Sequence, residues 1–245
     1  MKDARYAIFF VPPQDSALTR FGAKALGYDS YSGRELPSLS GDGISAAEWK
    51  ELTSEPRRYG FHATLKAPFH LRNGVSEDDL TAAFAAFAAG HEAPPRFAAS
   101  LKLLDGFAAL VPSAPVAMLD ALAAACVRDF DQFRQPLTDA ERERRLVHPL
   151  TERQADHLDR WGYPYVLEDF RFHMTLTGRL PAPRAQLILE FLHRALAREQ
   201  VPADIAVDTV ALLRQDEADA RFYVIRDVTL ASKASAADDR IAANG

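Results

Sequence analysis

The stretch GFHATL at residues 60–65 is repeated as FHMTL at residues 172–176, so the chain contains the pattern Phe-His-x-Thr-Leu twice. A random order of the same residues would contain both copies roughly a millionth of the time, which excludes coincidence. Two copies of one motif indicate an internal repeat, and the function then depends on what the copies do together.

The segments that follow the two motifs predict the same order of elements. Each copy opens a unit of strand, helix, strand and strand. The predicted elements are residues 61–69, 76–89, 97–104 and 107–111 in the first unit, and residues 172–178, 183–198, 205–213 and 221–230 in the second. Asp105-Gly106 is a strong hairpin signal between the last two strands of the first unit. A pseudo-twofold arrangement of the units would bring the two motif strands side by side.

The remaining segments predict a strand that Pro12 and Pro13 end, then helices over residues 16–26 and 114–133. The segment 28–43 is rich in Ser, Gly and Pro, and is expected to form either a binding loop or lid, or an ordinary surface loop. The tail over residues 232–245 has little to bury and is expected to be disordered.

Composition restricts the class of protein. The 245 residues are 48% hydrophobic and 26% charged, as in globular proteins. A net charge of −5 without a basic stripe argues against binding of long nucleic acid. The apolar run near the N-terminus is too short for a signal peptide or a membrane span, so we expect a cytoplasmic protein without a membrane partner. The sequence does not determine the oligomeric state, and a monomer is favoured. The single cysteine, Cys126, excludes a disulfide framework.

The two motifs offer the same chemistry on one face of a strand. Successive side chains of a strand alternate between faces, so His62 shares a face with Thr64, and His173 with Thr175. Imidazole titrates near neutral pH and can act as acid or base. A histidine pair therefore suits hydrolysis of a cyclic phosphodiester, in which one group activates water and the other protonates the departing oxygen. Threonine hydroxyls can stabilise the charge on the phosphate oxygens.

The stretches PRRYGFHATLKAPF and FRFHMTLTG resemble the two-histidine (2H) phosphoesterase superfamily, and more narrowly a bacterial family associated with phosphonate metabolism. The narrower resemblance runs from Tyr6 to about Leu230. It implies an α+β fold of two pseudo-symmetric lobes, each an antiparallel sheet with outer helices, and an active-site cleft between them. The expected bilobal domain covers residues 1–231, with lobes at about 1–112 and 113–231.

The same resemblance implies that His62 and His173 are the catalytic pair, that Thr64 and Thr175 bind phosphate, and that neither a metal nor another cofactor is needed. Cations and aromatic residues near the motifs are further candidates for substrate binding. These candidates are Arg57, Arg58, Tyr59, Lys66, Arg171 and Tyr6. Strand alternation favours Arg58, Lys66 and Arg171, whereas solvated surface charges are the alternative.

The sequence therefore predicts a metal-independent hydrolase that opens a small cyclic phosphate, either a 2′,3′-cyclic nucleotide or a ribose cyclic phosphate. A non-catalytic module that binds a phosphorylated small molecule is one alternative, and an RNA end-processing enzyme is another. Both histidines and both threonines favour catalysis, because binding alone does not require an acid and a base. The sequence contexts of His62 and His173 are nearly equivalent, so they do not assign the acid and the base.

Overall fold

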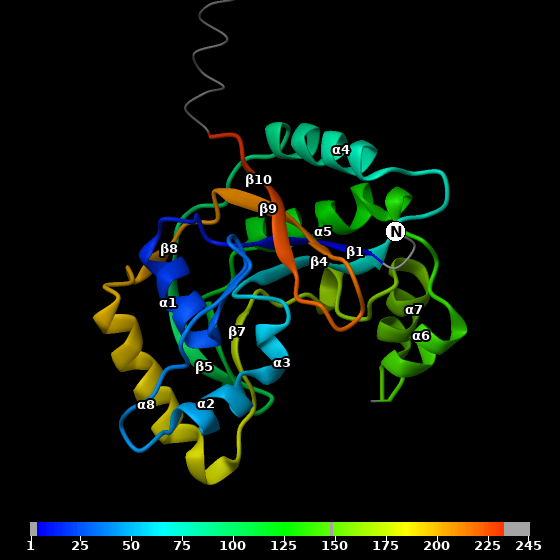
Figure 1. Cartoon of the computed structure of the whole chain (residues 1–245). Helices are drawn as coiled ribbons and strands as arrows, with labels where there is room; N and C mark the ends of the chain where they lie inside the picture. Colours follow the sequence, from blue (N-terminus) through cyan, green and yellow to red (C-terminus); the bar gives the residue numbers. More distant parts are fainter. Residues whose placement is uncertain (1–3, 148, 233–245) are drawn as a thin grey trace, which may run out of the picture.

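The computed structural model describes residues 4–147 and 149–232, and its main feature is one eight-stranded sheet (Figure 1). The strand order is β10-β9-β1-β4-β7-β6-β5-β8, and every pair of neighbours is antiparallel. The strands are β1 (Arg5–Phe10), β4 (Ala63–His70), β5 (Phe97–Leu104), β6 (Phe107–Pro112), β7 (Met174–Arg179), β8 (Asp204–Ile205), β9 (Thr209–Gln215) and β10 (Tyr223–Thr229). The α+β class is confirmed, while the tail predicted to be disordered lies outside the described residues from 233 onward.

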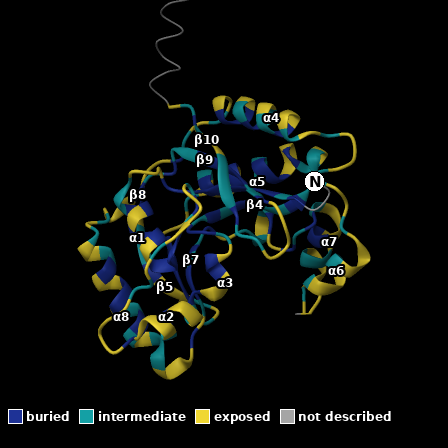
Figure 2. Ribbon diagram, viewed as in Figure 1, coloured by how far each residue is buried: buried dark blue, intermediate teal, exposed yellow. Residues whose placement is uncertain are grey.

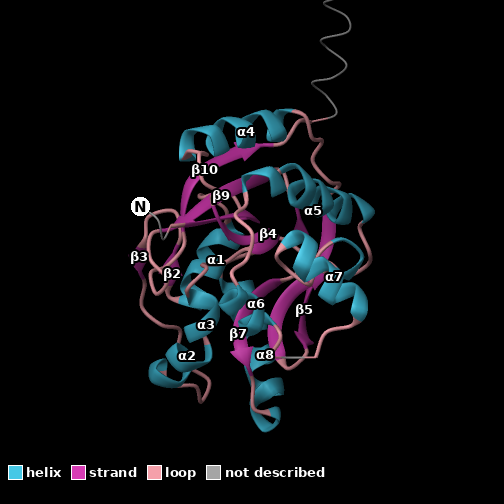
Figure 3. Ribbon diagram, turned by 90° about the vertical axis from the view of Figure 1, so that its right-hand side faces the viewer, coloured by secondary structure: helices cyan, strands magenta, loops and turns pink. Residues whose placement is uncertain are grey.

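The helices lie outside the sheet, which runs through the middle of the molecule (Figure 3). They are α1 (Ala17–Leu26), α2 (Ala46–Leu52), α3 (Ser54–Arg57), α4 (Glu77–Ala89), α5 (Ala117–Asp129), α6 (Asp139–Arg145), α7 (Glu152–Trp161) and α8 (Ala182–Arg198). Helix α4 packs on β9 and β10 at one end of the sheet, and α8 packs on β5 toward the other end. Each predicted repeat therefore contributes one outer helix to the sheet.

The two repeats exchange their hairpins. The hairpin β5–β6 follows the first motif in sequence, but β6 pairs with β7, the strand of the second motif. The hairpin β9–β10 follows the second motif, but β9 pairs with β1, which pairs with the first motif strand β4. The lobe boundary predicted between residues 112 and 113 therefore separates the repeats in the sequence and does not divide the sheet.

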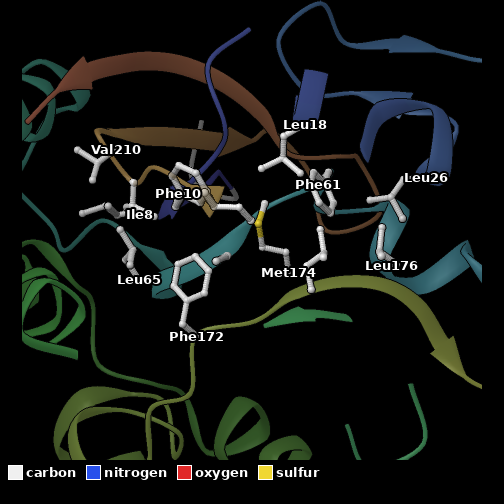
Figure 4. Packing of buried hydrophobic residues seen from close by; sticks show 14 of the residues in the cluster. Ile8, Phe10, Leu18, Leu26, Phe61, Leu65, Phe172, Met174, Leu176 and Val210 are labelled. Atoms are coloured by element: carbon white, nitrogen blue, oxygen red, sulfur yellow. The ribbon is translucent and has the colours of Figure 1, made fainter. Parts of the chain in front are cut away.

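Side chains alternate between the two faces of β4 and β7, so the core residues and the candidate site residues lie on opposite faces of the sheet. Phe61 and Leu65 in the first copy, and Phe172, Met174 and Leu176 in the second, are buried in one cluster (Figure 4). Figure 2 shows that the sheet is mostly buried and that the outer faces of the helices are exposed. Because these core residues occupy one face of β4 and β7, the intervening His and Thr residues must lie on the other face.

Local signals account for the turns. Asp105 and Gly106 both have positive φ, 46° and 92°, which is the geometry of a tight two-residue hairpin, and Leu104 pairs with Phe107 across it. The predicted hairpin is therefore confirmed. The helix predicted over residues 114–133 is shorter, because α5 ends at Asp129 and a 3₁₀ turn follows over Asp131–Phe133.

The segment 28–43 contains a small hairpin of its own. The strands β2 (Tyr28–Asp29) and β3 (Arg34–Glu35) form a separate two-stranded sheet. The buried Tyr28 hydroxyl donates to the carbonyl of Phe222, which attaches this hairpin to the segment before β10. In the part of the chain that the structure describes, no helix combines the length and apolar character needed to cross a membrane.

Candidate active site

The two motif strands are neighbours at the centre of the sheet. Strand β4 pairs with β7 through Ala63 and Met174, the residues that stand between His and Thr in each motif. Both are fully buried in the core, so the flanking residues of both strands emerge together on the opposite face. This set, His62, Thr64, His173 and Thr175, is called the HxT quartet below. The predicted side-by-side arrangement of the motif strands is confirmed.

His62 is held by its own backbone and by an aromatic ring. Its Nδ1 lies 2.8 Å from the carbonyl oxygen of Gly60, and its Nε2 lies 3.2 Å from Oγ1 of Thr64. The imidazole stacks on Phe9 of β1 with ring centroids 3.8 Å apart. Burial lowers the pKa of His62 to about 4, against the Gly60 hydrogen bond that raises it, and the charge of His173 lowers it further.

His173 repeats the backbone contact in different surroundings. Its Nδ1 lies 2.7 Å from the carbonyl oxygen of Arg171, again two residues earlier in the chain. The ring of Phe107 lies 5.8 Å away, centroid to centroid, and is tilted by 54°. Burial lowers the pKa of His173, and the neighbouring charge of Arg171 also lowers it, although the backbone hydrogen bond opposes both.

Gly60 accounts for the geometry of the first copy. It has a φ of +73°, and a Cβ atom at this position would lie 2.8 Å from Cβ of Ser30. Glycine adopts this left-handed conformation without steric cost. The turn at Gly60 ends the segment that follows α3, and it directs the Gly60 carbonyl toward His62. Strand β4 then begins at Ala63, immediately after the histidine.

A cavity of about 650 Å³ opens beside the quartet, and Thr64 and His173 both line it. Its walls also include aromatic side chains and the predicted binding residue Arg171. The aromatic residues are Phe107, Tyr163, Tyr165 and Phe170. A cavity of this size with polar groups on one wall is typical of small-molecule sites. Among the described residues, no group of three or more His, Cys, Asp and Glu side chains is positioned to hold a metal ion.

Two of the six additional binding candidates lie next to the quartet. The ring of Tyr59 is 5.9 Å from that of His62 and stacks on Phe222 at 5.4 Å. Arg171 is exposed and lines the cavity.

Lys66 and Arg58 do not lie where strand alternation predicted. Phe9 pairs with Thr64 and Ile8 with Lys66, so β4 contains one extra residue there and forms a bulge that breaks the alternation. Lys66 is buried and donates from Nζ to the carbonyl of Val127 at 2.9 Å. Arg58 precedes the turn at Gly60 and is exposed, with Nη2 bonded to the Ala218 carbonyl at 2.7 Å.

Arg57 and Tyr6 belong to the interior on other sides of the molecule. Buried Arg57 donates from Nε to the carbonyl of Leu26 at 2.5 Å and from Nη2 to Oγ1 of Thr53 at 2.6 Å, which joins α1 to α3. Tyr6 lies in the core with its hydroxyl 2.7 Å from Oε2 of Glu77. Neither residue lines the cavity beside the quartet.

The sequence interpretation missed Phe9 and Tyr163. Phe9 stands in the predicted first strand, and its stacking on His62 follows only once β1 is known to pair with β4. Tyr163 follows the left-handed Gly162 at the end of α7 and lines the cavity from there. Long-range pairing, which a single sequence does not specify, decides both positions.

Residues 64–223, more than half of the chain, match the family model described as "Protein of unknown function (DUF1045)". The chain belongs to the DUF1045 family. In this DUF1045 member the two His-x-Thr motifs, on which the resemblance to 2H phosphoesterases rests, lie together at the start of two paired central strands.

Curated relatives of this DUF1045 chain bear the name ribose 1,5-bisphosphate phosphokinase PhnN. The protein from Janthinobacterium sp. (strain Marseille) is 38% identical over 223 residues, which cover 89% of this chain and 49% of the relative. The protein from Laribacter hongkongensis (strain HLHK9) is 36% identical, with 92% of this chain and 52% of the relative covered. The chain thus spans about half the length of these relatives.

Solved structures of E. coli LigT also match this DUF1045 chain over nearly its whole length. The complex with 3′-AMP superposes with a TM-score of 0.40 at 12% identity, covering 93% of this chain and 98% of LigT. The complex with NADP⁺ has a TM-score of 0.40 at 11% identity, with coverage of 94% and 99%.

Proposed function

We propose that this protein is a metal-independent phosphoesterase that hydrolyses a small cyclic phosphodiester, with His62 and His173 as its acid and base. The observation that carries the proposal is the β4–β7 pairing at Ala63 and Met174, which brings two His-x-Thr pairs to one face beside a cavity. In-line attack on phosphorus needs a proton acceptor and a proton donor on opposite sides of the same atom.

The backbone contacts favour one tautomer of both histidines. A carbonyl oxygen only accepts, so Nδ1 of His62 and of His173 carries the hydrogen in each bond to the backbone. In the neutral ring Nε2 is then an unprotonated acceptor, and in the charged ring Nε2 is a donor. Both rings therefore use the same atom, Nε2, for proton transfer to or from a substrate.

We assign the base to His62 and the acid to His173. Burial, to which the stacked ring of Phe9 contributes, lowers the pKa of His62 to about 4, so the ring is neutral at physiological pH and Nε2 can accept a proton once a substrate displaces the Thr64 hydroxyl. Its Nε2 takes a proton from water as the oxygen attacks phosphorus. The ring P–O bond breaks, and Nε2 of His173 gives its proton to the departing oxygen. Proton exchange with solvent then restores the initial protonation states of the two histidine rings. The bound phosphate anion promotes the protonation of His173 that this step requires.

The threonines complete the proposed mechanism. Thr64 and Thr175 alternate with the histidines and would donate their hydroxyls to the non-bridging oxygens, where charge develops. Thr64 lies 3.2 Å from Nε2 of His62, so its hydroxyl occupies the reacting nitrogen until a substrate displaces it.

Among the candidate substrates, the relatives favour a ribose cyclic phosphate. Their name specifies a ribose bisphosphate as the substrate of proteins about twice as long as this chain. Hydrolysis of a ribose cyclic phosphate yields a ribose phosphate, so the two activities would follow one another on the same sugar. A 2′,3′-cyclic nucleotide remains the second member of the substrate class.

The decisive experiment is turnover of a panel of cyclic phosphates followed by phosphorus NMR. The panel contains ribose cyclic phosphates, 2′,3′-cyclic nucleotides and an RNA with a 2′,3′-cyclic end. We expect wild type to hydrolyse at least one ribose cyclic phosphate with EDTA present, and His62→Ala and His173→Ala each to lower the rate about 10²–10⁴-fold. His193→Ala is the matched control, because His193 is exposed on α8 and is expected to leave the rate unchanged.

Three other outcomes would contradict the proposal. Binding without turnover, weakened by the same two histidine variants, would favour a module that binds a phosphorylated molecule. Turnover restricted to the RNA would favour an RNA end-processing enzyme. Loss of all turnover in EDTA would require a metal in the mechanism.

A further inference from the structure

A second cavity of about 310 Å³ adjoins the cavity of the quartet. Four residues, Ala67, Val127, Tyr163 and Val166, line both cavities and form a common wall. The second cavity lies beyond the bulge in β4, where Lys66 donates to the carbonyl of Val127 in α5 and His70 lies 3.6 Å from Glu141 of α6. Two adjoining cavities can hold two parts of one ligand.

The second cavity is strongly cationic in a protein of net charge −5. Its lining contains five lysine or arginine side chains and a single carboxylate, that of Glu141. The five cations come from β1, β4, α6 and the segment after the 3₁₀ turn. They are Arg5, Lys66, Arg134, Arg144 and Arg145. Such a concentration of positive charge attracts a small anion.

The nearby carboxylates are already engaged. Asp131 lies 2.7 Å from Nε of Arg134 and 3.6 Å from Nζ of Lys66. Glu141 accepts from the backbone and side chain of Thr138 at 2.8 Å and 2.9 Å and lies 3.6 Å from Nε2 of His70. These two carboxylates therefore neutralise only part of the positive charge.

The direct contacts of the remaining arginines are with neutral groups. Arg5 donates from Nε to the neutral side chain of Gln215 at 2.7 Å, and Arg144 to the backbone of its own helix. Arg145 lies over the ring of Tyr163, 5.3 Å from its centroid. In the described ranges 4–147 and 149–232, none of these three forms an ion pair with a carboxylate. Burial lowers the pKa of Arg5 and of Arg145, and the charge of Glu141 opposes this effect only in part.

Tyr59 connects this charge to the quartet. Its ring lies 5.9 Å from that of His62 and stacks on Phe222, and the Arg5 guanidinium lies over the same Phe222 ring, 5.6 Å from its centroid. Together with the shared wall, this series of ring contacts from His62 to Arg5 places the cationic cavity within reach of a molecule bound at the histidines.

We propose that the second cavity binds a phosphomonoester through Arg5, Arg144 and Arg145, so that the substrate of the quartet is a cyclic phosphodiester that carries a second, terminal phosphate. Guanidinium groups match phosphate geometry and form charge-assisted hydrogen bonds to it. The statement about the substrate rests on the proposed function, whereas binding of a phosphomonoester in the cavity does not.

The test separates the cavity from the reaction site. Ribose 5-phosphate is titrated calorimetrically into a His62→Ala/His173→Ala double variant, with ribose as the uncharged control ligand. We expect ribose 5-phosphate to bind, ribose not to bind, and added Arg145→Gln to weaken binding at least about tenfold. Arg144→Gln is the second variant, since this exposed side chain can be changed without disturbing the core, and it should weaken binding in the same direction.

Arg128→Gln supplies the matched control. Arg128 is exposed on α5 next to Val127, yet lines neither cavity, so this variant removes the same charge nearby and should leave binding unchanged. Equal weakening by Arg128→Gln and Arg145→Gln would overturn the proposal, as would the absence of binding in the double histidine variant. If that absence accompanied normal turnover by wild type, the phosphoesterase function would stand and the second site would not.

Kinetics test the substrate class. If wild type hydrolyses ribose cyclic phosphates, Arg145→Gln should raise KM at least about tenfold for a substrate with a terminal phosphate. The same variant should leave KM unchanged for the matching substrate with a free hydroxyl. An equal change for both substrates would contradict a phosphate contact at Arg145.

Discussion

His62 stacks face to face on Phe9 with ring centroids 3.8 Å apart, whereas His173 has the ring of Phe107 at 5.8 Å and tilted by 54°. Both donate Nδ1 to the carbonyl two residues earlier, and both belong to the same motif. The difference lies in the aromatic residue that each neighbouring strand supplies, Phe9 from β1 beside β4 and Phe107 from β6 beside β7.

This comparison shows how two copies of a motif can acquire different roles. The repeat supplies two equivalent imidazoles, and the surrounding strands then alter their protonation separately. Phe9 removes water from His62, whereas the side chain of exposed Arg171 adds a positive charge near His173. Acid–base catalysis requires two groups with different protonation states, so asymmetry around a symmetric pair is what the proposed reaction needs.

After the histidine variants, the largest expected effect comes from the threonines. Thr64→Val and Thr175→Val should each lower kcat about 10²-fold, because each removes a donor to the phosphate oxygens. The comparison predicts a further difference. Thr64 contacts Nε2 of His62, so Thr64→Val should also shift the acid limb of the pH–rate profile, whereas Thr175→Val should not. Steady-state kinetics from pH 4 to 8 measures both effects.

The serine variants are the controls for this prediction. Thr64→Ser and Thr175→Ser retain the hydroxyl and should recover most of the rate. If valine and serine lowered kcat equally at either position, packing rather than hydrogen bonding would explain the loss.

The next effect concerns the pH dependence of the wild type. The base His62 is neutral above about pH 4, and the acid His173 is protonated only below a pKa that lies under its ordinary value of 6.5. The value of kcat/KM should therefore follow a bell with its maximum below pH 6.5. The profile of kcat should extend to higher pH, because the phosphate of a bound substrate raises the pKa of His173. A kcat/KM maximum above pH 7 would contradict the assignment.

A smaller effect appears in stability. The folded protein holds His62 neutral down to about pH 4, whereas the unfolded chain protonates it near 6.5. The unfolded state therefore binds more protons in this window, and the free energy of unfolding falls as the pH drops from 6.5 to 4. The contribution is at most about 3 kcal/mol, and solvent exposure reduces it.

The His62→Asn variant isolates this contribution. Urea unfolding at pH 7, 6, 5 and 4 should show a shallower decrease for the variant than for wild type, because the carboxylates titrate in both. His193→Asn, on the exposed surface of α8, should reproduce the wild-type decrease. Identical slopes for wild type and His62→Asn would mean that His62 titrates normally in the folded state.

The sequence was sufficient for the parts of the molecule that depend on local periodicity. Alternation in the two motifs predicted which residues enter the core and which form the quartet, and the repeated order of elements predicted that the motif strands lie together. The turn at Asp105-Gly106 was equally local, because both residues tolerate positive φ.

Long-range pairing set the limit of sequence-based prediction. The bulge in β4 turns Lys66 away from the quartet, and only the register against β1 reveals it. The exchange of hairpins between the repeats, the stack of Phe9 on His62 and the position of Tyr163 likewise depend on which strands and helices become neighbours. Arg58 was placed on the histidine face by assuming that the strand extends back to it. That assumption failed for a local reason, because the chain makes a left-handed turn at Gly60.

Substitution of Tyr6 has the smallest expected effect, and it tests which face of β1 contributes residues to the candidate active site. Its neighbours on the core face are Ile8 and Phe10, and its hydroxyl donates to Glu77, so it lies opposite Phe9. Tyr6→Phe should leave turnover and the pH–rate profile unchanged. It should lower the free energy of unfolding by about 1 kcal/mol, because one side-chain hydrogen bond is lost. A tenfold fall in turnover without a loss of stability would return Tyr6 to the substrate site, and would mean that the two faces of β1 are not separated as the core cluster indicates.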